Sequence, residues 1–158
     1  FIIVIAPVIE ETLFRGIIQK PLEKYGKMLA IVVSSLLFAI YHGNIIQGIY
    51  AFICGLLLGF VASEYSLKYS VILHVFNNLI STIIENKPFT ELYKNHFANT
   101  SVMIISAFFA VWYILEKYPV LKNYSKVNRP IFDGAYRICL LSLPVILFAV
   151  ICLLPIFI

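Results

Sequence analysis

Six apolar segments separated by short polar connectors restrict this chain to one class of structure. Hydrophobic residues make up 61% of the sequence and charged residues only 13%, whereas soluble domains carry about 25% charged residues. So few charges cannot cover a water-exposed surface, which excludes a soluble globule. Unpaired sheet edges are not tolerated in hydrocarbon, so we expect an all-α, polytopic transmembrane helical bundle. The six membrane-embedded helices are expected at 1–18, 28–42, 45–63, 67–84, 99–115 and 136–158.

The expected domain organisation is a single membrane-embedded domain over residues 1–158, a fragment of a longer protein because the sequence begins inside an apolar run. The candidate functional motifs lie in residues 1–84, and two further helices are expected at 99–115 and 136–158. A span needs about 20 residues to cross about 30 Å of hydrocarbon. The segment 28–42 is shorter than that, so it either crosses at a tilt or stops part-way.

The basic residues predict an orientation in the cell membrane. The connectors 19–27 and 116–135, with the turn near residue 66, hold eight lysines and arginines, and the alternate connectors hold two. The positive-inside rule then places the first set in the cytoplasm. We therefore expect a multi-pass protein whose active-site cavity opens to the cytoplasmic side. The net charge of +4 is spread over short clusters between apolar runs, so the lipid bilayer is the expected partner and nucleic acid is not.

Ionisable residues inside the first apolar segment are the strongest functional signal. A charge at the bilayer centre costs at least about 2.5–3.5 kcal/mol, so such residues are candidates for function. Glu11 and Arg15 are four residues apart and can pair on one helix face. Glu10 points about 100° away from Glu11 and is free to project elsewhere. The alternative is that all three lie near the cytoplasmic end and extend to water.

Two histidines add to this signal. His42 ends the second segment, four residues after Phe38, where a capping or interfacial role is the alternative. His74 and Asn78 are four residues apart in the fourth segment and share a helix face. A pair of this kind also serves to hydrogen-bond a neighbouring helix.

A stripe of small residues marks the third segment as a packing helix. Gly55 and Gly59 form a GxxxG pattern, which lets another helix approach closely. Packing within the chain is the favoured interpretation, and a dimer interface is the alternative.

Together, one carboxylate and two imidazoles from three helices support two hydrolytic schemes. In the metal-free scheme, Glu10 is the general base on a water that His42 orients. His74 and Asn78 then stabilise the oxyanion of the tetrahedral intermediate. In the zinc scheme, Glu10, His42 and His74 are the metal ligands, although the sequence contains no HExxH or HxxEH motif. Both schemes hydrolyse a peptide bond inside the membrane.

The motifs EExxxR, FxxxH and HxxxN follow one another on successive hydrophobic segments. In this order they resemble the three motifs of the CAAX prenyl protease and bacteriocin-processing (CPBP, or Abi) family. The resemblance covers roughly residues 1–84. It implies an integral membrane endopeptidase that acts on a membrane protein or peptide, and eukaryotic members remove the last three residues of prenylated CAAX proteins.

The resemblance also assigns roles to residues of this chain. It makes Glu10 the catalytic base with His42, and His74 with Asn78 the oxyanion pair. The family has been labelled metalloprotease, but the motifs fit a glutamate-dependent mechanism, so we expect no cofactor, with zinc as the alternative. The remaining charged residues of the first motif match supporting positions: Glu11 and Arg15.

Two other classes of function remain open at this stage. One is a non-enzymatic bacteriocin-immunity or scaffolding membrane protein that uses the same fold to bind a partner. The other is a proton-coupled transporter, since intramembrane Glu and His residues also form proton relays. The sequence shows no internal repeat symmetry, which disfavours the transporter. Convergence of the candidate residues on one site would favour the protease.

Overall fold

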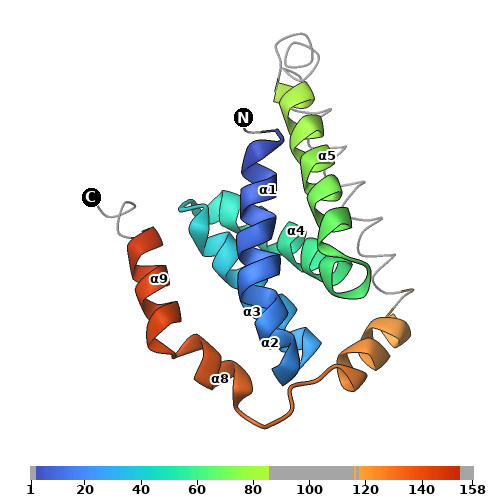
Figure 1. The fold of residues 1–158 in the computed structure, drawn as a ribbon, viewed down its shortest axis with the longest axis vertical. Helices are drawn as coiled ribbons and strands as arrows, with labels where there is room; N and C mark the ends of the chain where they lie inside the picture. Colours follow the sequence, from blue (N-terminus) through green and yellow to red (C-terminus); the bar gives the residue numbers. More distant parts are fainter. Residues whose placement is uncertain (1–2, 86–115, 117, 154–158) are drawn as a thin grey trace. The chain divides into compact units, whose positions relative to one another are not determined.

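The computed structural model describes residues 3–85, 116 and 118–153, and within them every regular element is a helix (Figure 1). The all-α class is therefore confirmed for these residues. Among them, one helix is long and apolar enough to cross a membrane, with its span at Gln47–Glu64. The predicted helix at 99–115 lies outside the described residues.

The described chain forms two compact units. The first comprises Phe1–Phe76 and Asn128–Ile158, and the second comprises Asn77–Val127. The second unit contains the C-terminal part of the helix that crosses the boundary and a helix over residues 118–127. The candidate site described below is built from the first unit.

The first apolar segment is a continuous helical run that changes its winding midway. The EExxxR motif lies across the junction between an α-helix and a π-helical stretch. π-Helical turns are uncommon and occur frequently at functional sites. The run comprises α1 (Ile5–Glu11), the π-helix η1 (Thr12–Gln19), α2 (Lys20–Leu22) and the 3-10 helix η2 (Glu23–Tyr25).

Three further helices follow, and they match the predicted second, third and fourth segments closely. They are α3 (Lys27–Tyr41), α4 (Ile45–Glu64) and α5 (Leu67–Glu85). α3 packs against η1, α4 and the helix near the C-terminus, so it is the central helix of the first unit. Its buried apolar side chains join those of η1 and α4 in one hydrophobic core, which includes Phe14, Leu29, Val33, Leu37, Phe38 and Ala51.

The small residues of α4 pack within the chain, as predicted. A Cβ atom on Gly55 would lie 3.1 Å from Ser35 Cβ, and one on Gly59 would lie 2.8 Å from Gln19 Oε1. The backbone of α4 is thereby within reach of side chains from η1. Arg15 Nη2 donates to Gly55 O at 3.1 Å, and Gln19 Nε2 donates to Gly59 O at 2.8 Å. The GxxxG pattern of α4 therefore serves packing against other helices of the same chain.

Within the first unit, the end of connector 19–27 is bonded to the last residues of connector 116–135. Met28 N donates to Asn128 O at 3.2 Å, and Ile131 N donates to Tyr25 O at 3.0 Å. Gly26 lies between them with a φ of 131°, and a Cβ there would come within 2.9 Å of the adjacent backbone. Connector 19–27 thus lies beside the end of connector 116–135, which agrees with their predicted placement on the same side.

The last apolar segment is divided, and the prediction of one helix over 136–158 was wrong in this respect. The structure has α8 (Ala135–Leu140) and α9 (Leu143–Leu153). Pro144 has no amide hydrogen and is tolerated only in a first helical turn, so a new helix begins beside it. Ser142 Oγ donates to Cys139 O at 2.7 Å and satisfies a carbonyl at the break.

Candidate active site

The candidate site is organised around Glu11, a carboxylate that is fully buried. Its Oε2 atom accepts a hydrogen bond from Ser70 Oγ and lies 3.3 Å from Arg15 Nε. Its Oε1 atom lies 3.0 Å from His74 Nδ1. The predicted pairing of Glu11 with Arg15 is therefore confirmed. Because both side chains are buried inside the chain, neither extends to water as the alternative required.

Three different groups interact with the buried positive charge of Arg15. Besides the Glu11 carboxylate, its guanidinium donates to Gly55 O and lies 4.6 Å from the centroid of the Phe38 ring. A ring face attracts a cation, and the attraction is larger when both are removed from water. Arg15 thus connects η1 to both α3 and α4 at the level of the candidate site.

His74 lies between the two glutamates of the EExxxR motif. A carboxylate oxygen can only accept, so the contact with Glu11 places a hydrogen on Nδ1 of His74. The opposite ring nitrogen, Nε2, lies 3.7 Å from Glu10 Oε2. The Glu10 side chain is 18% exposed while that of Glu11 is 0% exposed. Adjacent glutamates therefore have different environments, since Glu10 is partly exposed and Glu11 is enclosed.

His42 is also bonded through Nδ1. Its Nδ1 lies 2.8 Å from Phe38 O, and because a carbonyl only accepts, this nitrogen carries the hydrogen. In the neutral ring, Nε2 is then free to accept a hydrogen bond from water. The Phe38 ring contacts both imidazoles edge-on, with centroid distances of 4.7 Å to His42 and 5.7 Å to His74. Glu10 interacts electrostatically with both histidines.

Glu10 and His74 therefore face each other, and His42 and His74 contact the same Phe38 ring. These are three of the four residues that the sequence marked for water activation and oxyanion binding, and their catalytic roles stay predictions. Asn78 lies on α5 one turn beyond His74, in the second compact unit. Its role as the second oxyanion donor stays a prediction.

The structure does not decide between the metal-free scheme and the zinc scheme. Within residues 3–85, 116 and 118–153, no three His, Cys, Asp or Glu side chains are gathered as a metal-binding group. The histidines do each donate from Nδ1 and leave Nε2 available, which is a pattern that metal-ligating histidines also use. The zinc alternative therefore stays a prediction, and no step below depends on a metal.

Sequence reasoning missed Ser70 and Gln19. Ser70 precedes His74 by four residues and Gln19 follows Arg15 by four, so helix spacing from the charged residues was the available signal. Gln19 is buried and donates to Ser63 Oγ at 2.9 Å in addition to its bond with α4. Uncharged polar residues fit a helix interior too readily to stand out in a sequence.

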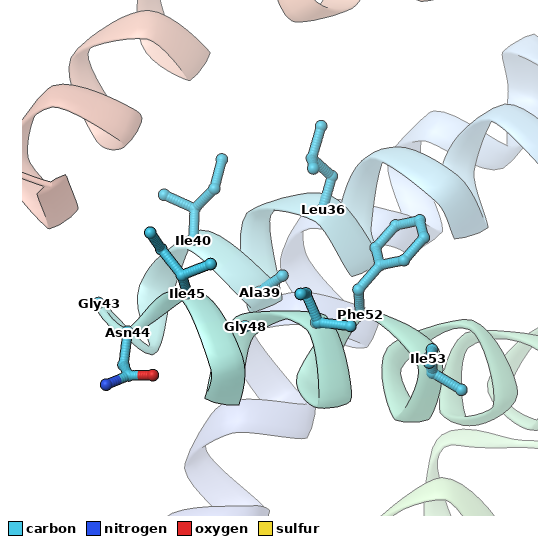
Figure 2. A pocket seen from close by; sticks show the side chains of 10 residues that line it. Leu36, Ala39, Ile40, Gly43, Asn44, Ile45, Gly48, Phe52 and Ile53 are labelled. Carbon is cyan, nitrogen blue, oxygen red and sulfur yellow. The ribbon is translucent and has the colours of Figure 1, made fainter.

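An apolar groove lies between α3 and α4 (Figure 2). On α3 it is lined by Leu36, Ala39 and Ile40. At about 100° per residue, these lie on a different face of the helix from Phe38 and His42. The groove is therefore not part of the candidate site.

Comparison with protein families gives one match. The family model described as type II CAAX prenyl endopeptidase, Rce1-like, matches residues 1–80, about half of the chain. No curated protein and no solved structure matches. The matched region contains the whole of EExxxR, FxxxH and HxxxN, and with them the buried cluster just described. The chain belongs to the family of Rce1-like type II CAAX prenyl endopeptidases.

Proposed function

We propose that this protein is an intramembrane endopeptidase that hydrolyses a peptide bond of a membrane-associated protein or peptide. Family membership supports the class of reaction. The observation that carries the proposal is the position of His74, which contacts buried Glu11 through Nδ1 and faces the more exposed Glu10 through Nε2. Hydrolysis requires such convergence from separate helices, whereas a scaffolding or immunity protein does not.

In the proposed mechanism, Glu10 and His42 activate the water. The Glu10 carboxylate takes one proton from the water, and His42 Nε2 accepts a hydrogen bond from the other O–H. The oxygen attacks the carbonyl carbon of the scissile bond and forms a tetrahedral intermediate. Glu10 then returns its proton to the leaving nitrogen as the carbon–nitrogen bond breaks. The products are a carboxylic acid and an amine, and no other reactant is consumed.

His74 and Asn78 stabilise the negative charge that develops on the carbonyl oxygen. Hydrogen-bond donors placed where this charge appears act most strongly in a site that excludes water. His74 already donates from Nδ1 to Glu11, so it donates to the oxyanion when its ring also carries a hydrogen on Nε2. Glu11 and Arg15 support this arrangement from within the core.

The proposal extends to the membrane setting. We place the protein in the cell membrane as a multi-pass bundle of about six embedded helices, with the cavity open to the cytoplasm. The backbone bonds from Asn128 and Ile131 to connector 19–27 and the residue after it support a shared side for the two connectors. We propose that no cofactor takes part.

The test is a comparison of membrane peptides from cells that express wild-type protein, Glu10→Gln or Glu64→Gln. Glu64 is a matched control, because its carboxylate pairs with Lys27 at 2.7 Å and is 31% exposed. We expect cleavage products in cells with wild-type protein and Glu64→Gln that are missing with Glu10→Gln. The same set of peptides with Glu10→Gln as with wild-type protein, at equal protein levels, would contradict the proposed function.

A further inference from the structure

Three serines of the first unit are completely buried, and one of them contacts a charged side chain. Ser34 donates to Phe14 O at 2.8 Å and Ser35 donates to Ile31 O at 2.7 Å, so both satisfy backbone carbonyls. Ser70 instead contacts the Glu11 carboxylate, with Leu58 O 3.1 Å away as a second acceptor.

Ser70 and His74 approach the same carboxylate from the same helix. They are four residues apart on α5 and therefore lie on one face. Ser70 contacts Oε2 of Glu11 and His74 contacts Oε1, so α5 contacts both oxygens of the group. The terminal torsion of a glutamate is intrinsically broad. Contacts to both oxygens are what fix the plane of the carboxylate, and with it the direction of the His74 ring.

We propose that Ser70 is a positioning residue that acts through Glu11 to aim Nε2 of His74 at the reaction site. This inference rests on the proposed function, since it gives His74 the role of an oxyanion donor. Without the hydroxyl, Oε2 keeps only the 3.3 Å contact with Arg15, and the carboxylate turns toward the guanidinium. The contact of Oε1 with His74 then weakens, and the imidazole loses its fixed orientation.

The kinetic test uses the purified full chain in lipid bilayers and a fluorogenic peptide that carries a cleavage site found in the comparison of membrane peptides. Misplacement of a reacting group by about 1 Å, caused by a substitution outside the reacting atoms, can cost about 10²-fold in rate. We expect Ser70→Ala to lower kcat by this factor with KM unchanged, because the oxyanion contact exists only in the transition state. Ser70→Thr keeps the hydroxyl and should restore kcat.

Ser34→Ala is the matched control. It also removes a completely buried hydroxyl, but one that bonds the backbone carbonyl of Phe14 and not the Glu11 carboxylate. It should keep the wild-type kcat even where its melting temperature falls as far as that of Ser70→Ala.

A second measurement follows the His74 ring directly. The chain has three histidines, so ¹⁵N spectra of histidine-labelled protein can be assigned with single substitutions. The ring signals of His74 should change in Ser70→Ala and stay in place in Ser34→Ala. This result does not depend on catalysis, so it also holds for a variant that is too slow to assay.

The outcomes separate the two levels of the proposal. If Glu10→Gln cleaves the peptide as fast as wild-type protein, the proposed function is wrong, whatever the serine variants do. If Glu10→Gln is inactive but Ser70→Ala matches Ser34→Ala in kcat and in the His74 ring signals, the positioning role of Ser70 alone is overturned.

Discussion

At the scale of single residues, the molecule stabilises charge in its interior by giving each charged group several partners. Glu11 receives contacts from Ser70, Arg15 and His74, which come from two different helical elements. Arg15 contacts the Phe38 ring and a backbone carbonyl in return. Because Glu11 and Arg15 neutralise each other, removing either side chain alone leaves the buried charge of the other without its partner.

This mutual dependence predicts the behaviour of Arg15→Ala. Breaking a buried ion pair by removing one partner costs on the order of 3–5 kcal/mol, because the remaining charge stays buried. We expect Arg15→Ala to accumulate poorly and the double variant Glu11→Gln/Arg15→Ala to recover part of the wild-type level. Membrane immunoblots with a shared epitope tag measure both levels. Normal accumulation and activity of Arg15→Ala would contradict the pairing.

The sequence predicted the pairing of Glu11 with Arg15, but it did not indicate the neutral residues that contact this pair. Glu11 and Arg15 were identified because charges in an apolar segment demand partners at helical spacing. Ser70 gave no such signal, since a hydroxyl can bond the backbone of its own helix, as Ser35 does. Which acceptor a serine uses depends on the helix packed against it, and that is a property of the tertiary structure.

At the scale of helices, close packing between α3 and α4 depends on glycine at position 55. A Cβ there would lie 3.1 Å from Ser35 Cβ and 3.2 Å from Ser35 Cα, and a helix backbone yields less readily than the end of a long side chain. At Gly16, the nearest atom to an added Cβ is Leu67 Cδ2 at 3.7 Å, an ordinary contact. The two glycines provide a matched pair of helical sites.

We predict that Gly55→Ala lowers the melting temperature and that Gly16→Ala does not. Over-packing a tight interface typically costs about 1–3 kcal/mol, whereas alanine in a helix is favoured over glycine by about 1 kcal/mol. Thermal unfolding of the two purified variants in one detergent measures the difference. Equal melting temperatures for Gly55→Ala and wild-type protein would show that the interface is looser than described.

A second prediction at this scale concerns the polar contacts between η2 and α4. Burial raises the pKa of the Glu23 carboxyl, but hydrogen bonds from Ser63 and Lys20 and the charge of Lys20 outweigh it, so this pKa lies below its ordinary value of 4.5. A carboxyl whose pKa is lower in the folded state adds stability above its unfolded pKa. That stability is lost as the pH falls through the folded-state value.

Melting curves of wild-type protein and Glu23→Gln at a series of pH values test this. We expect wild-type protein to melt at the higher temperature above pH 4.5 and the difference to shrink on acidification. A difference that stays constant, or grows, as the pH falls would contradict the role of the ionised carboxylate.

The sequence predicted where helices occur but not how they wind or break. The apolar segments predicted α3, α4 and α5 correctly, because polar connectors and helix-breaking residues mark where each segment ends. The π-helical winding of η1 had no recognisable signal in the sequence. The break before α9 did have one, Pro144, whose missing amide hydrogen ends the hydrogen-bond pattern of α8.

At the scale of the whole molecule, the orientation in the membrane is the first testable property. Backbone hydrogen bonds between Met28 and Asn128 and between Tyr25 and Ile131 place the last residues of connector 116–135 beside connector 19–27 within the first unit. Basic connectors favour the cytoplasm. We therefore predict that both connectors are cytoplasmic.

Cysteine labelling checks this prediction. In a background without the three native cysteines, Lys24→Cys and Lys122→Cys should resist a membrane-impermeant thiol reagent in intact cells and react after permeabilisation. Reaction of either cysteine in intact cells would contradict the orientation.

The central claim is that Glu10 activates a water molecule for peptide hydrolysis without a metal. The most direct measurement is the rate at which purified protein in lipid bilayers cleaves a peptide found in the comparison of membrane peptides. After prolonged chelation, wild-type protein should keep its rate, and Glu10→Gln should be slower by about 10²–10⁴-fold, the usual contribution of a general base. Equal rates for Glu10→Gln and wild-type protein, or a wild-type rate that chelation abolishes and zinc restores, would contradict the account.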